Sequence, residues 1–262
     1  MEGDSVVLIL SKYRRTLKGN MIADMFDRGA VAARRIVRQL PGTALDLLFP
    51  LNCLGCQREG KILCASCVDS LPELKPPFCR VCAQPNAPAT CHRCLESPPA
   101  FDGIRAPYGM EGTVKEAIHN MKYRGLKAAA PELAELLANY LEEHPMPGDV
   151  LTPVPLHPRR LRSRGYNQSA LLAKELSKKL GLDMNQSLLI RAKNNQPQVS
   201  ASRDERRENV QGSFRCDGRA DGRTVILVDD VATTGSTLSA CAAALKAAGA
   251  SSVWCLVLAR EG

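Results

Sequence analysis

The sequence predicts an α/β protein with a parallel sheet, preceded by a small cysteine-rich module. Three observations lead to this class. Strand-like and helix-like segments alternate over the C-terminal part of the 262 residues, as in a parallel sheet with crossover helices. One apolar run, residues 224–228, ends in two adjacent carboxylates and a loop of small residues. Eight of the 11 cysteines fall within residues 53–94, all in C-x-x-C pairs.

Residues 1–44 are expected to be an extension outside both modules. Residues 23–40 have helical apolar spacing with four arginines, which suits a surface-docked or mobile helix. Contact with a membrane surface or a partner is the alternative. No apolar run approaches the roughly 20 residues that span a membrane, and the run at 6–10 is too short for a secretion signal. We therefore expect a cytoplasmic protein without stable membrane insertion.

The cysteine pairs of residues 45–97 predict two structural zinc sites. Two C-x-x-C pairs complete a tetrahedral site of four thiolates, which leaves no position open for catalysis. Because this segment has few apolar residues, metal has to supply its folding free energy, on the order of 10 kcal/mol per site. Sequential pairing is expected, and interleaved pairing is the alternative. The expected ligands are Cys53, Cys56, Cys64, Cys67, Cys79, Cys82, Cys91 and Cys94.

Residues 98–262 are predicted to form the α/β domain, and Pro98-Pro99 marks its start. Hydrophobic periodicity and Gly or Pro breaks define its elements. Residues 188–215 are polar and are expected to be irregular. The expected strands are 101–111, 149–154, 224–230 and 252–259. The expected helices are 113–123, which we expect to be capped, 131–144, 167–180 and 236–248.

The strand at 224–228 leads into residues suited to a ribose 5-phosphate. Asp229 and Asp230 accept hydrogen bonds from sugar hydroxyls but do not hold phosphate. The next loop has no bulky side chain, and a helix N-terminus points at the same place, so its N–H groups suit a phosphate. The alternative is an ordinary capped turn. The expected phosphate cradle is Ala232, Thr233, Thr234, Gly235, Ser236 and Thr237.

A basic segment follows the strand at 149–154. Four arginines occur within residues 159–164, in an expected loop at the C-terminal end of a strand, where open α/β sheets bind ligands. Guanidinium forks suit a diphosphate; a solvated loop and a nucleic-acid contact are the alternatives. Residues 151–262 hold 17 Lys and Arg against 10 Asp and Glu, which places the positive field here. Residues 198–209 are expected to form a mobile hood over the site.

The segment 224–237 resembles the phosphoribosyl-diphosphate (PRPP) signature of type I phosphoribosyltransferases. The whole chain from about residue 45 resembles the ComF/GntX family of competence-associated proteins. This resemblance is carried by the eight cysteines, the run from Pro153 to His157, residues 164–168, Arg207 with Asn209 and Val210, and residues 227–237. It implies a double zinc ribbon before a type I phosphoribosyltransferase-like domain, PRPP as ligand and magnesium with it. By the same analogy, the diphosphate would lie against Leu156, His157, Arg159 and Arg164.

The resemblance favours a role in DNA uptake or the use of external DNA. The protein would then work with single-stranded DNA or DNA-uptake proteins. The alternative is an active phosphoribosyltransferase of nucleotide metabolism whose acceptor is unknown. Hypoxanthine-type transferases have a further aspartate where Thr233 stands, so purine salvage with that residue as base is not expected. The sequence predicts no catalytic residue and no oligomeric state.

Overall fold

The computed structural model describes residues 51–191 and 213–262. From Cys53 to Gly262 the described residues belong to one compact unit. The expected extension at 1–44 and the expected hood at 198–209 lie outside the described residues. Within the described ranges, no helix is long and apolar enough to cross a membrane.

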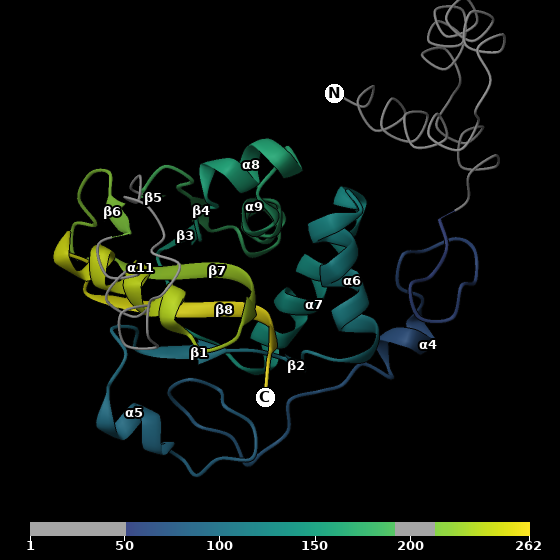
Figure 1. Cartoon of the computed structure of the whole chain (residues 1–262), viewed down its shortest axis with the longest axis horizontal. Helices are drawn as coiled ribbons and strands as arrows, with labels where there is room; N and C mark the ends of the chain where they lie inside the picture. The colour runs from purple at the N-terminus through teal and green to yellow at the C-terminus, as the bar shows by residue number, and fades with distance from the viewer. Residues whose placement is uncertain (1–50, 192–212) are drawn as a thin grey trace, which may run out of the picture. The chain divides into compact units, whose positions relative to one another are not determined.

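A parallel sheet lies at the centre of this unit (Figure 1), which confirms the expected fold class. Its strand order is β1-β8-β7-β3-β4, with β2 also paired to β8, and every pairing is parallel. β7 lies between β3 and β8, so the carboxyl ends of three neighbouring strands meet at one edge. The strands are β1 (Gly103–Arg105), β2 (Tyr108–Gly109), β3 (Val150–Pro153), β4 (Asp183–Met184), β7 (Thr224–Ala232) and β8 (Ser252–Arg260).

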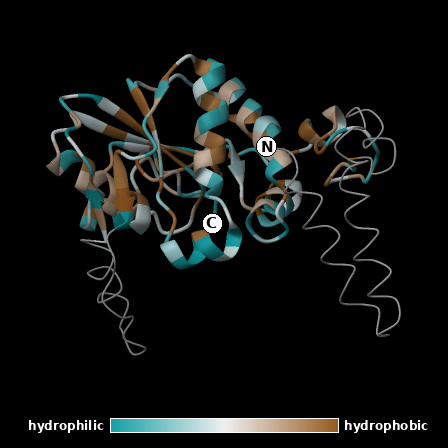
Figure 2. Ribbon diagram, turned by 90° about the horizontal axis from the view of Figure 1, so that it is seen from above, coloured by the Kyte–Doolittle hydropathy of each residue, from teal (hydrophilic) through white to brown (hydrophobic). Residues whose placement is uncertain are grey.

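Alternate residues of the central strands supply two separate cores, because successive side chains of a strand point to opposite faces. Val225 and Leu227 pack in one core with α11. Ile226 and Val228 pack in the other, with α6, α7 and α9. The central strands are accordingly mostly brown in Figure 2, while the helices carry both colours. The long helices are α6 (Gly112–Tyr123), α7 (Ala130–Glu143), α9 (Gln168–Leu180) and α11 (Ser236–Ala247).

The arginine-rich segment is a short helix, α8 (Pro158–Arg164), where we expected a loop. Three local features explain the difference. The side chain of His157 accepts a hydrogen bond from Arg159 N–H and caps the helix. Pro158 occupies the first helical position, where a missing N–H costs little. Gly165, at φ 80°, ends the helix in the left-handed conformation.

Other boundaries differ modestly from the expected ones. The strand expected at 101–111 is divided into β1 and β2, since Pro107 between them lacks a backbone N–H. The helix expected to be capped begins at Gly112, and its N-cap residue, Glu111, makes no side-chain capping bond. The segment expected to be irregular contains a small antiparallel pair, β5 (Leu189–Arg191) and β6 (Phe214–Cys216). The short helices α4 (Ala65–Val68) and α5 (His92–Glu96) belong to the cysteine-rich part.

Candidate functional site

The two expected ribose-binding carboxylates lie near the end of β7 in different surroundings. The Asp229 carboxylate is partly buried, and its Oδ1 accepts hydrogen bonds from Ser169 Oγ (2.7 Å) and from the N–H of Asp230 (2.9 Å). Ser169 lies in the first turn of α9. Asp230 is 4% exposed, and its Oδ1 lies 2.9 Å from Nζ of Lys122 on α6. Helices on one face of the sheet therefore position both acids.

Burial makes both carboxylates costly to ionise. It raises the pKa of Asp229 to about 7, helped by the neighbouring charge of Asp230 and opposed by the Ser169 hydrogen bond. Burial also raises the pKa of Asp230, an effect that the Lys122 ammonium opposes. Among the described residues, Oδ2 of Asp230 is buried without any hydrogen-bond partner. A buried carboxylate oxygen in this state is suited to accept a hydrogen bond from a ligand.

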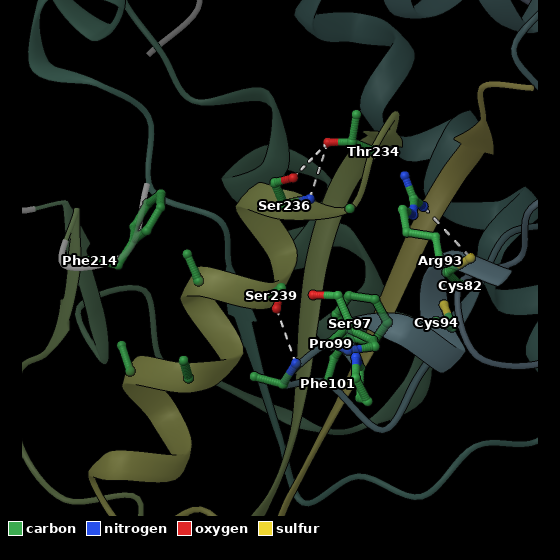
Figure 3. A pocket seen from close by; sticks show the side chains of 16 residues that line it. Cys82, Arg93, Cys94, Ser97, Pro99, Phe101, Phe214, Thr234, Ser236 and Ser239 are labelled. Atoms are coloured by element: carbon green, nitrogen blue, oxygen red, sulfur yellow. Dashed lines mark hydrogen bonds between the residues drawn. The ribbon is translucent and has the colours of Figure 1, made fainter. Parts of the chain in front are cut away.

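The expected phosphate cradle connects β7 to α11. Gly235 adopts φ 76°, a left-handed conformation that favours glycine, and α11 begins at the next residue. The hydroxyls of Thr234 and Ser236 lie 2.9 Å apart, and Ser236 N–H donates to Thr234 Oγ1 at 3.3 Å (Figure 3). Thr233, Thr234 and Thr237 are exposed. Hydroxyls therefore stand in solvent at the N-terminus of a 12-residue helix, which is where an anion is stabilised.

The expected diphosphate-side residues follow β3 but do not act as one group. Leu156 lines a 580 Å³ hollow between α8 and α9. The His157 ring caps α8 through Nδ1, and burial together with nearby arginines lowers its pKa. Arg159 is exposed, while Arg164 is half-buried and donates to Oε1 of Gln168. Of these four side chains, Arg164 is near enough to Asp230 to favour its charged form.

Sequence analysis missed three residues that support the site. Lys122 lies on the helix expected at 113–123, and no pattern distinguished it from an ordinary exposed lysine. Ser169 lies on the helix expected at 167–180, and no pattern distinguished it from an ordinary helix serine. Arg260 follows the apolar strand expected at 252–259, yet it is 1% exposed. Of the three, only Arg260 could have been found from the sequence, because a charged residue directly after a fully buried strand needs a partner.

Two groups of four cysteines converge in the order expected from sequential pairing. Sulfur atoms within each group all lie within 4.8 Å of one another. A tetrahedral zinc ion with Zn–S bonds of about 2.3 Å requires S···S distances of about 3.8 Å. Distances of 3.6 Å between Cys53 and Cys64 and 3.7 Å between Cys82 and Cys91 fit that requirement. The first group is Cys53, Cys56, Cys64 and Cys67, and the second is Cys79, Cys82, Cys91 and Cys94.

The two cysteine groups differ in their environment. All four members of the second group are buried, and they pack in the same core as α11 and one face of β7. In the first group Cys56 is exposed and only Cys53 is buried. The N–H groups of Ile62 and Leu63 donate to the Glu132 carboxylate on α7, at 3.3 and 2.7 Å. Zinc at the second group would therefore be embedded in the core of the α/β domain.

Comparison with known proteins matches both parts of the chain. A double zinc ribbon domain matches residues 44–96, and a phosphoribosyl transferase domain matches residues 167–262. The DNA utilization protein YhgH of Escherichia coli O157:H7 is 34% identical over 67% of this chain and 83% of its own. Competence protein F of Haemophilus influenzae is 28% identical over 81% of this chain and 98% of its own. The solved purine phosphoribosyltransferase of Pyrococcus horikoshii Ot3 is 21% identical, with a TM-score of 0.32, over 49% of this chain and 70% of its own.

These findings define a protein in which a double zinc ribbon precedes a phosphoribosyltransferase domain. The two cysteine tetrads support structural zinc in that ribbon. The chain belongs to the ComF/GntX family, whose relatives named above are a competence protein and a DNA utilization protein. The expected family and fold class are thereby confirmed.

Proposed function

We propose that this chain binds PRPP or a closely related sugar phosphate at the end of β7, in support of DNA uptake or the use of external DNA. The main support for this ligand is that Oδ2 of Asp230 is buried without a hydrogen-bond partner. It lies at the same sheet edge as a loop whose exposed hydroxyls stand at the N-terminus of α11. The biological role is supported by the relatives named for competence and DNA utilization.

Each half of the ligand has a matching chemical partner in this arrangement. The ribose hydroxyls would donate to Asp229 and Asp230, and the 5-phosphate would accept N–H and O–H bonds from residues 233–237. The diphosphate would extend toward α8, where Arg164 and the exposed Arg159 supply positive charge. Magnesium, whose preferred ligands are oxygens, would accompany the diphosphate.

The Lys122–Asp230 ion pair has a consequence for binding. Because Lys122 contacts only Oδ1 of the carboxylate, the lone pairs of Oδ2 remain free for a ribose hydroxyl while the ion pair is kept. The ammonium would also keep Asp230 charged while the ligand displaces water from the site. Lys122 therefore assists the ribose contact without touching the phosphate loop.

DNA is the partner class we propose for the exposed face of α8. Arg159, Arg160 and Arg162 are exposed there. Such a group of guanidinium ions can contact a phosphate backbone without reading its sequence. DNA-uptake proteins would be the further partners of this chain, in keeping with the names of its relatives.

Isothermal titration calorimetry with PRPP and magnesium tests the ligand. Wild-type protein should bind, and Asp229→Asn/Asp230→Asn should weaken binding about a hundredfold or more, because each of the two lost charged acceptors contributes about 1.5–3 kcal/mol. The matched control is Asp217→Asn, which removes the charge of an exposed carboxylate directly after β6. Absence of heat with the wild type, or equal affinity in the double variant, would contradict the proposal.

A further inference from the structure

Arg260 connects the second cysteine group to the loop proposed to bind phosphate. Its side chain is buried at the end of β8. Nε donates to the carbonyl oxygen of Cys82 (2.9 Å) and Nη2 to Oε1 of Gln84 (2.6 Å). Nη1 donates to the carbonyl oxygens of Ala232 (3.1 Å) and Thr233. One guanidinium therefore contacts a zinc-ligand residue and the first two residues of the phosphate loop.

These contacts fix the direction of the loop's amide groups. In a trans peptide unit the C=O and the following N–H point in opposite directions. Since the carbonyls of Ala232 and Thr233 point at Arg260, the N–H groups of Thr233 and Thr234 point away from it. These amides belong to the loop proposed to hold the phosphate. Arg260 therefore orients amide donors of that loop while making no contact with the ligand itself.

The second cysteine group also balances the buried charge of Arg260. Within the described ranges, Arg260 forms no ion pair with a carboxylate. Its guanidinium is buried, and its Nε donates to the carbonyl oxygen of the ligand residue Cys82. Four thiolates around one Zn²⁺ form a complex with net negative charge. Assembly of that complex thus stabilises the guanidinium in the position that orients the loop.

Cys82, Cys94 and Arg93 line one side of a 490 Å³ hollow, and Thr234 and Ser236 lie across it (Figure 3). Among the described residues that line this hollow, none belongs to the first cysteine group, which is attached through Glu132 to α7. α7 packs in the core on the opposite face of the sheet from α11.

We infer that zinc at Cys79, Cys82, Cys91 and Cys94 sets the ligand affinity of the phosphate loop, with Arg260 as the positioning residue. Zinc at the first group has no such effect. The inference rests on the proposed ribose-phosphate site. Because coupling between two sites is reciprocal, the ligand must also strengthen the binding of that zinc ion by the same factor.

The test measures zinc release from the full chain carrying two zinc ions. A chelator is titrated with and without saturating ribose 5-phosphate, and a metal indicator reports each released equivalent. With the sugar phosphate present, release of one zinc equivalent should require at least about five times as much chelator. This factor corresponds to the lower end of common coupling free energies. The other equivalent should be released at the same chelator concentration in both cases.

Two matched variants separate coupling from general damage. Gln84→Ala removes one acceptor of Arg260 and leaves all eight cysteines, whereas Glu132→Gln alters the attachment of the first group. Both should retain two zinc ions by metal analysis. Gln84→Ala should bind ribose 5-phosphate several-fold more weakly and lose most of the zinc protection, and Glu132→Gln should change neither. Arg260→Lys, if it folds, should behave like Gln84→Ala because an ammonium cannot reproduce the fork.

Each outcome bears on a different claim. If ribose 5-phosphate binds but protects neither zinc ion, or protects both equally, this inference is overturned and the proposed function stands. Unchanged protection and affinity in Gln84→Ala and Arg260→Lys would also overturn it. If the wild type binds neither ribose 5-phosphate nor PRPP, both claims fail; if it binds PRPP alone, the same chelator titration is made with PRPP and its outcomes are read in the same way.

Discussion

Asp229 is an acid whose surroundings disfavour its charge. Burial and the adjacent Asp230 raise its pKa to about 7, although Ser169 donates a hydrogen bond to it. A group held in this way contributes little to folding at neutral pH and is well suited to receive donors from a ligand. The ribose hydroxyls would supply the hydrogen bonds that the carboxylate lacks in the free protein.

The raised pKa of Asp229 predicts a pH-dependent stability. The folded state binds this proton more tightly than the unfolded chain, whose aspartate pKa is near 3.8. The resulting stabilisation is present below pH 3.8 and is lost as the pH rises toward about 7. Asp229→Asn should therefore lose less free energy of unfolding between pH 5 and 8 than wild type, by roughly 2 kcal/mol. Urea titrations at several pH values measure this difference.

Asp217→Asn serves as the control for the pH series, because Asp217 is an exposed carboxylate. Its stability curve should follow that of the wild type. Parallel curves for Asp229→Asn and wild type would show that Asp229 is ionised in the folded state with an ordinary pKa, contrary to the account of this residue.

The sequence predicts the positions of the acids and hydroxyls of the site but not the residues that contact them. The apolar run before Asp229 and the small loop after Asp230 are local features, so they can be read without a fold. Lys122 reaches Asp230 from a helix more than 100 residues earlier in the chain. Such a contact depends on tertiary packing, so no local sequence pattern predicts it.

At the scale of an element, α8 shows how a basic segment can have two faces. Arg164 turns inward to Gln168 and toward the acid pair, while Arg160 and Arg162 remain exposed. The expected loop would have left all the arginines equivalent. Because the segment is helical, we assign Arg164, with Arg159 in the first turn, to the ligand, and the outward Arg160 and Arg162 to DNA.

The outward face of α8 predicts salt-dependent DNA binding. Arg160→Ala/Arg162→Ala should weaken binding of single-stranded DNA and flatten its logarithmic salt dependence by about 1.4, at about 0.7 per phosphate contact. PRPP binding should persist, because neither arginine is part of the proposed ligand site. Fluorescence anisotropy at several salt concentrations gives the slope.

A control pair removes the same charge elsewhere. Arg219 and Arg223 lie just before β7, at the opposite end of that strand from the site, and are exposed. Arg219→Ala/Arg223→Ala should leave the slope nearer to that of the wild type. Equal slopes for the two double variants would mean that α8 has no special role in DNA binding.

For the whole molecule, the two cysteine groups are expected to play unequal parts. Their spacing predicted four thiolates per zinc ion, and the structure brings them together in sequential order. Spacing alone could not show that the second group shares a core with α11 while the first keeps an exposed cysteine. That asymmetry arises from which face of the sheet each group packs against.

The fold class was predictable at this scale because it follows from repeated, local patterns. Alternating strands and helices predict a parallel sheet, and β7 between β3 and β8 places the expected sites at one edge. The contacts of Arg260 were not predictable, since they join residues 178 positions apart. The coupling between zinc and ligand therefore belongs to the tertiary structure.

The central claim is that the end of β7 recognises the hydroxyls of a ribose 5-phosphate. Calorimetric titration of the wild type with ribose 5-phosphate and with 2-deoxyribose 5-phosphate tests it most directly, because the two differ by one hydroxyl. Ribose 5-phosphate should bind at least about tenfold more tightly than 2-deoxyribose 5-phosphate. The deoxy compound lacks one hydroxyl donor and therefore leaves a buried carboxylate without a hydrogen bond. Equal affinities, or no binding of either compound, would contradict the account.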